Sequence, residues 1–258
     1  MYYLSVTAIF RDENHWLEEW IRYHHYLGVE HFYLYNNDVD RTDADRILQP
    51  YIDSGLVDNI PYPGQFRQLS AYQDVLKYQA HGSYWMGFLD LDEFIVPKNF
   101  DSIPKFLEQY ETEKGIAVHW NIFGSGGLIE TPPNQIEYFL WRAVENHSAN
   151  CHVKSIVQPK YVQHEPMYNP HLFNLTEGKT IDENGNEVTD AICNYAGNQI
   201  RIAHYAVRSY QYFVTIKSKR GSPIALTAPK NTEYWNYFNR NEVFDNEIAE
   251  RFGHIVQK

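Results

Sequence analysis

Apolar and polar residues along the first half of the chain follow two alternating periods. Strand-like runs rich in aromatic and β-branched residues are expected at 2–10, 29–35, 56–60, 84–89 and 115–123. Apolar residues at helical spacing predict helices at 16–27, 42–51, 69–80 and 103–110. Strands and helices in this order are typical of a mostly parallel sheet covered by helices. The pattern therefore predicts an α/β fold with a Rossmann-like central sheet.

Residues with clear helix-end preferences mark three of these boundaries. Gly28 follows the first helix, where a C-terminal glycine is common. Thr42, with Asp45 three positions later, has the spacing of an N-cap for the second helix. Asp101-Ser102 is expected to cap the fourth helix, with Pro104 in its first turn.

The regular order ends near residue 130, and later segments are shorter and richer in loops. Residues 177–190 are polar with a glycine near the middle, and we expect an exposed hairpin or flexible loop there. Residues 200–205 resemble a strand. The sequence shows no repeat, low-complexity tract or separating linker. We therefore predict one domain, 1–258, with a regular half (1–128) and an irregular half (129–258).

The chain is acidic, with a formal net charge of −11. Nucleic-acid-binding surfaces and polybasic membrane-binding patches are basic, so neither is expected here. Aromatic residues make up 16% of the chain, which fits stacking on sugar rings as well as ordinary core packing. The two cysteines form no metal-binding or disulfide pattern, and no signal peptide or run of about 18 apolar residues is visible. These features predict a cytoplasmic protein.

Polar clusters follow three of the predicted strands. They are Arg11-Asp12, Asn36-Asn37-Asp38 and Asp90-Leu91-Asp92. Because the carboxyl ends of parallel strands meet at one edge of a sheet, we expect these clusters to lie close together. Ligands of open α/β sheets bind at that edge, so the clusters predict the position of a site.

The apolar run 88–96 is interrupted by Asp90, Asp92 and Glu93. Burying an unpaired carboxylate is costly, so a positive partner is expected there. Asp90 and Asp92 are two positions apart, and in an extended chain their side chains point the same way. They could share Mn²⁺ or Mg²⁺, which accept oxygen ligands, with Glu93 as a salt-bridge partner. A solvated turn or helix cap is the alternative interpretation.

Three other features could complete such a site. His204 could add an imidazole to the metal shell, or could be a hydrogen-bonded structural residue. Lys217, Lys219 and Arg220 fall within four positions and could close over a diphosphate, or form a solvated loop. The segment 120–127 leads from a strand into a glycine-rich turn, where the backbone can approach a ligand closely. It matches neither a Walker phosphate-binding loop nor a dinucleotide fingerprint.

Several sequence blocks occur in a characteristic order. They are Arg11-Asp12-Glu13, 20–29, 31–37, Asp90-Leu91-Asp92-Glu93-Phe94, 120–127, 154–159, His204-Tyr205 and 217–221. Together they resemble glycosyltransferase family 92 and its bacterial relatives over nearly the whole chain. The resemblance implies a GT-A fold, a nucleotide-sugar donor, a divalent metal and inversion at the anomeric carbon. Two positions depart from the family pattern, since Arg11 replaces a lysine and Asp12 replaces an asparagine.

We therefore expect a metal-dependent, inverting glycosyltransferase. It would move a hexose, with galactose favoured, from a UDP-sugar to a glycan or glycolipid acceptor in polysaccharide or lipopolysaccharide synthesis. It would lack a transmembrane segment and act at the inner membrane face. Residues 1–128 would hold the donor, and 129–258 the acceptor and a closing loop. The expected donor-binding residues are Arg11, Asp12, Asp38, Asp90, Trp120, Gly124, Lys154, Lys217 and Arg220, and the expected metal ligands are Asp90, Asp92 and His204.

Inversion requires a base that takes the proton of the acceptor hydroxyl. Glu165 is the first candidate, followed by Glu145 and Glu137. A glycoside hydrolase would also use two carboxylates, but from different segments about 5 Å or more apart. A nucleotidyltransferase would show a glycine-rich basic loop after the first strand, and residues 11–16 contain no glycine. A non-catalytic sugar-binding protein is a further alternative, in which ligand affinity would not depend on Asp92.

Overall fold

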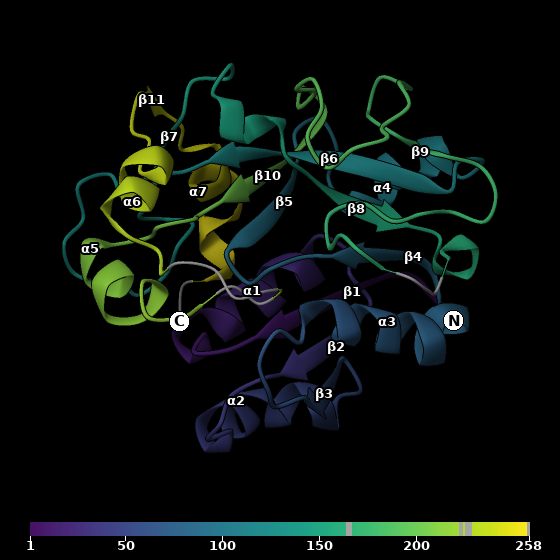
Figure 1. Ribbon diagram of the computed structural model, residues 1–258, viewed down its shortest axis with the longest axis horizontal. Helices are drawn as coiled ribbons and strands as arrows, with labels where there is room; N and C mark the ends of the chain where they lie inside the picture. The colour runs from purple at the N-terminus through teal and green to yellow at the C-terminus, as the bar shows by residue number, and fades with distance from the viewer. Residues whose placement is uncertain (164–166, 222–223, 225–228, 257–258) are drawn as a thin grey trace.

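The computed structural model describes residues 1–163, 167–221, 224 and 229–256. In these residues one curved, mixed sheet of nine strands carries helices on both faces (Figure 1). The strands are β1 (Tyr2–Phe10), β2 (His31–Asn36), β3 (Val57–Pro61), β4 (Ser83–Phe88), β5 (Glu93–Pro97), β6 (Gly115–Ile122), β8 (Val153–Val157), β9 (Thr180–Ile181) and β10 (Ile200–His204). Their spatial order is β3–β2–β1–β4–β8–β6–β10–β5, with β9 paired to β6. The α/β fold predicted from the sequence is confirmed.

The helices of the first half lie where the sequence predicts them. They are α1 (Asn14–Tyr26), α2 (Thr42–Asp53), α3 (Gln68–Gln79) and α4 (Ile103–Leu107), the last extended by a 3₁₀ turn at Glu108–Tyr110. Later helices are short: α5 (Tyr210–Tyr212), a π-helical turn at Phe213–Lys217, α6 (Thr232–Phe238) and α7 (Glu247–Phe252). Further 3₁₀ turns lie at Ala80–Gly82, Ser148–Cys151, Pro159–Tyr161 and Gly253–Ile255. Within the described ranges, no helix has the length and apolar character needed to cross a bilayer.

Side-chain alternation along the parallel strands explains the two helical layers. On β2, Phe32 and Leu34 belong to the core that includes α1 and α2, whereas Tyr33 and Tyr35 pack with α3. Strands β3, β2, β1 and β4 are mutually parallel, and the inner strands β2, β1 and β4 are largely buried between helices, whereas the edge strand β3 is partly exposed. Each large apolar side chain removed from water contributes about 1.5–3 kcal/mol, which fixes the register of this half.

Polar groups of α1 cover the edge strand β5. The indole Nε1 of Trp20 donates to the Glu93 carbonyl at 2.9 Å, and the Tyr23 hydroxyl donates to the Ile95 carbonyl at 3.0 Å. The Ile95 amide donates to Nε2 of His24 at 3.2 Å. These bonds satisfy the backbone groups that an edge strand leaves without a neighbouring strand. They also fix β5 directly after the acidic turn at residues 90–92.

Two of the three helix-end predictions are confirmed. Gly28 has φ +97°, and a Cβ there would lie 2.8 Å from Cδ of Pro104, so both its backbone and its packing require glycine. Ser102 caps α4 by accepting a hydrogen bond from the Lys105 amide at 3.3 Å.

The N-cap prediction for Thr42 is wrong. Thr42 is the first residue of α2, and its side chain makes no capping bond to the helix. Instead, Asp40 accepts hydrogen bonds from the Thr42 amide at 3.0 Å and from its hydroxyl at 2.7 Å. The turn before the helix therefore uses an aspartate two positions upstream.

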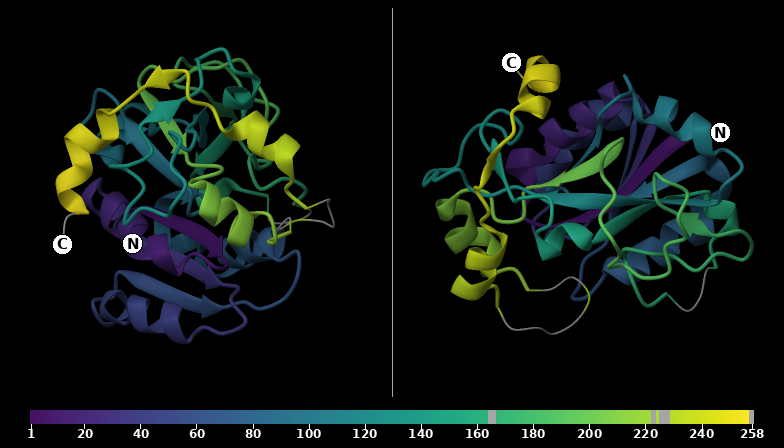
Figure 2. Two further views of the ribbon diagram at one scale, coloured as in Figure 1. Left: turned by 90° about the vertical axis from the view of Figure 1, so that its left-hand side faces the viewer. Right: turned by 90° about the horizontal axis from the view of Figure 1, so that it is seen from above.

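Strands of the second half complete the same sheet. β8 lies antiparallel between β4 and β6, and β10 runs parallel to β6 and antiparallel to β5. The predicted strand at 200–205 is confirmed as β10. Figure 2 shows the strands of both halves side by side in one layer. A separate small sheet pairs β7 (Trp141–Arg142) with β11 (Val243–Phe244).

The prediction of an exposed hairpin or flexible loop at 177–190 is correct for the hairpin, since Ile181 pairs antiparallel with Glu187 and the Val188 amide donates to the Thr180 carbonyl at 2.9 Å. The predicted exposure is only partly correct. Residues 180–183 are buried, and Thr180 and Ile181 form β9. The carboxylate of Glu183 accepts hydrogen bonds from the backbone amides of Asn198, Gln199 and Ile200 at 2.7–2.9 Å. Polar residues often indicate an exposed segment, but the Glu183 carboxylate is buried because it satisfies the backbone amides that lead into β10.

Candidate functional site: a cleft at the ends of the parallel strands

A cleft of about 530 Å³ lies at the carboxyl ends of the parallel strands. This is within the range of about 300–1,000 Å³ that is usual for small-molecule sites. One wall is formed by residues after β1, β2 and β4, and the other by the segment that follows the π-helical turn. The lining residues are Ile9, Phe10, Arg11, Glu13, Asn37, Gly64, Gln65, Phe66, Arg67, Gln68, Asp90, Leu91, Asp92, Trp120, His171, His204, Lys217, Lys219, Arg220, Gly221, Ile224, Lys230 and Tyr234.

Asp90 is paired with the buried side chain of Lys154. The Lys154 ammonium donates to Oδ2 of Asp90 at 2.9 Å and lies 3.3 Å from Oε2 of Glu93. Gln68 donates to the other Asp90 oxygen at 2.8 Å. Burial alone would raise the pKa of the Asp90 carboxyl, but Lys154 outweighs it and the pKa is lowered. Burial raises the pKa of Glu93 to about 8, against the opposing effect of Lys154.

Asp92 faces the opposite wall. Its Oδ2 accepts a hydrogen bond from the Lys217 ammonium and lies 3.7 Å from Nε2 of His204. Burial opposes ionisation, yet Lys217 and His204 hold the pKa of Asp92 well below its usual range. The ring of Trp120 packs on His204 with centroids 4.3 Å apart. Among the described residues, neither Nδ1 of His204 nor Nε1 of Trp120 has a hydrogen-bond partner.

The chemistry of this site fits a divalent cation, but the arrangement is incomplete. Carboxylate and imidazole groups are ligands that Mn²⁺ accepts, and Asp92 and His204 are already neighbours. Nδ1 of buried His204 has no partner among the described residues, whereas a metal-bound histidine usually donates its other ring N–H to one. Within the described part of the chain, however, no three acidic, cysteine or histidine side chains converge. Lys217 takes the Asp92 oxygen and Lys154 takes Asp90.

Glu13 joins two arginines at the floor of the cleft. One carboxylate oxygen accepts a hydrogen bond from Arg208 at 2.5 Å, and the other accepts bonds from Arg220 at 2.6 Å and the Tyr212 hydroxyl at 3.1 Å. Glu13 is 3% exposed and Arg208 1%. Arg220 also donates to the Arg11 carbonyl. Burial would raise the pKa of Glu13, but the two guanidinium groups lower it.

Arg208 also positions the acidic turn. Its Nη2 donates to the Leu91 carbonyl at 3.0 Å, and its Nε donates to Oε1 of Gln135 at 2.7 Å. The backbone of Arg208 has φ +56°, a conformation that is strained for a residue with a side chain. The buried ion pairs hold this residue where it supports the turn between Asp90 and Asp92.

The sequence profile of glycosyltransferase family 92 matches residues 1–248. The chain belongs to glycosyltransferase family 92. Similar proteins of that name include one from Oryza sativa subsp. japonica, 25% identical over 273 residues, covering 99% of this chain and 44% of that protein. Another, from Ricinus communis, is 25% identical over 183 residues, covering 68% of this chain and 32% of that protein. The chain thus spans less than half the length of these relatives.

Solved structures with some likeness include S. aureus TarS 1–349, at 12% identity and a TM-score of 0.42, covering 66% of this chain and 52% of that one. The same TarS fragment in complex with UDP has a TM-score of 0.39 and 12% identity, covering 63% of this chain and 51% of that one. Scores this low support no conclusion about the site. The parallel strands β3–β2–β1–β4 have the α/β arrangement expected from the sequence for a family 92 chain.

The structure brings most of the residues predicted for donor and metal binding into one place. The predicted residues that line the cleft are Arg11, Asp90, Asp92, Trp120, His204, Lys217 and Arg220. Lys154 does not line it, because its 1%-exposed side chain is buried beneath Asp90 and Glu93. The convergence of the strand ends, expected from the parallel order alone, is present.

Three predicted donor-binding residues have structural partners instead. Oδ1 of Asp38 accepts a hydrogen bond from the Asp12 amide at 2.7 Å, which ties the end of β1 to the end of β2. Asp12 has φ +56° and does not line the cleft. Gly124 packs against the protein itself, since a Cβ there would lie 2.3 Å from the Arg240 carbonyl oxygen. The close approach that glycine permits is therefore to residue 240.

Two of the three candidate bases, Glu145 and Glu137, do not line the cleft. Glu165 lies outside the described residues. Glu145 is exposed on a loop, and Oε2 of Glu137 accepts a hydrogen bond from Asn134 at 2.6 Å near the C-terminal turn. The acidic residues that line the cleft are Glu13, Asp90 and Asp92 in the described part of the chain, and each contacts a cation.

Several cleft residues were given no role from sequence. The most important of them is Glu13, whose buried partner Arg208 is 195 positions away, so no local pattern links the two. A signal existed in Ala206-Val207-Arg208, where one cation ends an apolar run, because such a cation needs a buried partner. Gln68, Lys230 and Tyr234 also line the cleft, and burial together with nearby Lys217 and Arg220 lowers the pKa of Lys230 to about 8.

The support for Arg208 predicts a measurable pH effect at Glu19. Glu19 accepts hydrogen bonds from the amides of Gln135 and Ile136 at 2.8–3.0 Å, and these residues carry the loop that binds Arg208. Burial raises the pKa of Glu19 from 4.5 to about 7, against these bonds. Because the folded-state pKa is the higher one, the contribution to stability is full below pH 4.5 and is lost as pH rises through 7.

Between pH 5 and 8, we expect the unfolding free energy of the wild type to fall relative to that of Glu19→Gln, by on the order of 3 kcal/mol. Urea denaturation at a series of pH values measures this. Parallel pH profiles for the two proteins would show that Glu19 does not titrate in this range.

Proposed function

We propose that this family 92 chain is a metal-dependent, inverting glycosyltransferase. It would transfer a hexose, with galactose favoured, from a UDP-sugar to a glycan or glycolipid acceptor. The observation that carries the proposal is a single cleft at the strand ends. There Asp90 and Asp92 line the same cleft as Lys217 and Arg220, and Lys217 contacts Asp92 directly. Carboxylates for a cation and ammonium or guanidinium groups for phosphate are both present.

The two ends of the cleft support different parts of the donor. Lys217, Lys219, Arg220 and Lys230 gather at one wall and are suited to the diphosphate. At the other, Phe66 has φ +55° and a partly exposed ring. A strained backbone at an exposed aromatic residue favours a ligand role, and we assign stacking of the uracil base to it.

Asp92 and His204 would hold Mn²⁺ or Mg²⁺, with Asp90 as a further oxygen ligand once its own partners allow. The bound cation would supply positive charge next to the leaving diphosphate. The cations of the opposite wall would add to that charge. Trp120, packed on His204, would border the transferred sugar.

In the proposed reaction, the acceptor oxygen forms a bond to the anomeric carbon while the bond from that carbon to the diphosphate oxygen breaks on the opposite side. The hydroxyl proton passes to a carboxylate, for which Glu165 stays our first candidate. The electron pair of the broken bond stays on UDP. Single displacement inverts the configuration.

A donor screen tests this function. UDP- and GDP-sugars, each with Mn²⁺ or with EDTA, would be assayed for nucleotide release with and without glycan acceptors. We expect release from UDP-galactose that needs the metal. Hydrolysis of a simple glycoside in the presence of EDTA would indicate a glycoside hydrolase. Sugar binding without nucleotide release or glycoside hydrolysis would indicate a non-catalytic protein.

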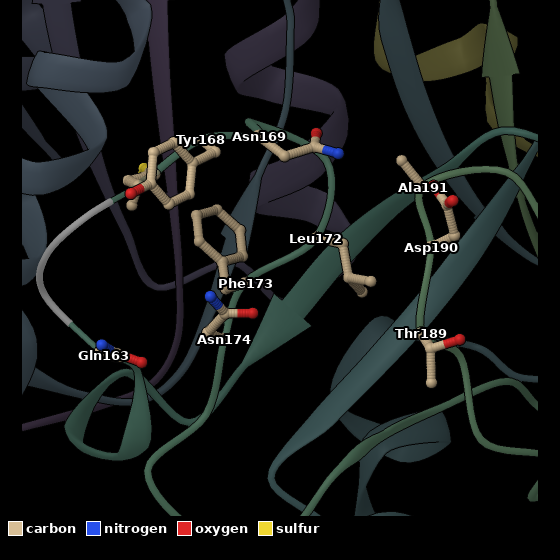
Figure 3. A pocket seen from close by; sticks show the side chains of 10 residues that line it. Gln163, Tyr168, Asn169, Leu172, Phe173, Asn174, Thr189, Asp190 and Ala191 are labelled. Carbon is tan, nitrogen blue, oxygen red and sulfur yellow. The ribbon is translucent and has the colours of Figure 1, made fainter.

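A second hollow on the protein is a candidate binding site for the acceptor. It has a volume of about 250 Å³. Figure 3 shows side chains that line it, among them Tyr168, Leu172, Phe173 and Asp190. Segment 167–174 contributes to both, since His171 lines the cleft and Phe173 lines the hollow. Phe173 packs on Phe88 with centroids 4.3 Å apart, so this wall is anchored in the core. We propose that the hollow holds a sugar unit of the acceptor.

Tyr168 provides the test of that location. Its ring is 78% exposed at the rim of the hollow, where it can stack on a sugar face. Tyr168→Ala is expected to raise the KM for an oligosaccharide acceptor about tenfold, or roughly 1.4 kcal/mol, while donor hydrolysis is unchanged. Tyr78→Ala, at a 65%-exposed ring on α3, is the matched control. Equal acceptor KM values in both variants would exclude the hollow.

A further inference from the structure

Acidic and basic side chains of the cleft are already paired with one another. Asp92 is paired with Lys217, Asp90 with Lys154 and Glu13 with Arg220. The proposed function assigns Asp92 to a divalent cation and Lys217 to a diphosphate. Both groups must therefore leave their present partner when those ligands bind.

The pair between Asp92 and Lys217 is the one placed for exchange. Both side chains are largely buried, at 3% and 6% exposure, and both line the cleft. Asp92 lies on the rigid turn after β4, whose Leu91 carbonyl is held by Arg208 at 3.0 Å. Lys217 ends a π-helical turn, a rare local structure that often occurs at functional sites. A four-carbon side chain can reorient from that position while the turn itself stays fixed.

The pair between Asp90 and Lys154 differs. Lys154 is 1% exposed, belongs to the central strand β8 and contacts Glu93 as well as Asp90. Moving it would leave two acidic groups without a cation in the interior, which is costly. Lys154 is therefore a fixed charge below the site, and Lys217 is the exchangeable one.

We propose that Lys217 is a resident cation that occupies the Asp92 carboxylate in the donor-free protein and transfers to the donor diphosphate when a divalent metal takes that carboxylate. This inference rests on the proposed function and adds a property to it. Metal alone must displace an ammonium group, and diphosphate alone must pull that ammonium from a carboxylate. When both bind, the metal replaces Lys217 as the partner of Asp92, and the diphosphate replaces Asp92 as the partner of Lys217. The metal and the donor therefore bind cooperatively.

Cooperativity of this kind is reciprocal, because the factor by which UDP tightens metal binding equals the factor by which metal tightens UDP binding. Lys217→Met removes the competing ammonium and keeps the aliphatic part of the side chain. Lys219→Met removes a cation from the same wall, and the described residues show no acidic partner for Lys219 within salt-bridge distance. It is the matched control for general loss of positive charge.

Titration calorimetry of Mn²⁺ alone, UDP alone and Mn²⁺ with saturating UDP tests the proposal without any catalytic readout. For the wild type, we expect UDP to tighten Mn²⁺ binding at least tenfold. For Lys217→Met, we expect Mn²⁺ alone to bind at least tenfold more tightly than to the wild type, and UDP to tighten that binding by a smaller factor than it does in the wild type. Lys219→Met should weaken UDP binding but leave the affinity for Mn²⁺ alone unchanged.

An unchanged or weaker affinity of Lys217→Met for Mn²⁺ alone would overturn the proposal, provided that thermal unfolding shows a folded variant. If that variant does not fold, Lys217→Ala is compared in the same way. A wild type that binds neither UDP nor UDP-sugars, with or without metal, would instead contradict the proposed donor. The comparison with Mn²⁺ alone does not depend on that result, so the two failures are distinguishable.

Discussion

Replacing Asp92 with asparagine is expected to lower sugar transfer at least a hundredfold. This corresponds to about 3 kcal/mol of lost transition-state stabilisation. Asp92 is the carboxylate that His204 and Lys217 both face, and no other acidic side chain in the described structure pairs with Lys217. The neutral amide keeps the shape but removes the charge that a metal or an ammonium needs. Initial rates with a UDP-sugar and its acceptor measure the effect.

The same substitution leaves Lys217 without its carboxylate, so stability must be measured in parallel. Asp101→Asn, on an exposed bend before α4, controls for the general effect of losing one negative charge. Near-normal turnover in folded Asp92→Asn would reject both the metal ligand role and the position of the site. A fall in activity that matches a fall in the folded fraction would assign Asp92 a structural role only.

Replacing Glu13 with glutamine is expected to lower the unfolding free energy by about 3–5 kcal/mol. This is the usual cost of removing one partner from a buried ion pair, because the other charge is left uncompensated. Glu13 neutralises Arg208 and Arg220 together at 2.5 and 2.6 Å; Glu13 and Arg208 are buried, and the Arg220 side chain is 19% exposed. Denaturant or thermal unfolding measures the loss.

Activity should fall with it, since Arg208 supports the Leu91 carbonyl and Arg220 lines the cleft. Glu108→Gln is the matched control. Its partner Lys105 lies 2.9 Å away on the surface, where such a pair contributes less than about 1 kcal/mol. Equal stability losses in the two variants would show that the Glu13 pairs are worth no more than a surface pair.

The parallel half of the fold could be predicted because its signals are local. Periodic apolar residues determine α1 to α3 and β1 to β4, and the parallel order then requires the strand ends to share one edge. Asp90 and Asp92 were assigned to the site on that basis, and His204 and Lys217 from their residue types and the family resemblance. The structure places all four in one cleft. The antiparallel strand β8 was missed as a strand, since its central position depends on pairing with β4 and β6, and the sequence does not encode pairing locally.

Residue identity and spacing alone determined the α/β fold, the strand-end site and the acidic turn of this protein. Only the tertiary structure decided which acidic side chain pairs with which basic one. Glu13 contacts arginines about 200 positions away, Asp92 contacts a lysine 125 positions away, and Asp38 binds a backbone amide instead of facing the cleft. The physical reason is that hydrophobic periodicity acts along the chain, whereas electrostatic pairing acts through space and selects its partners after the chain has folded.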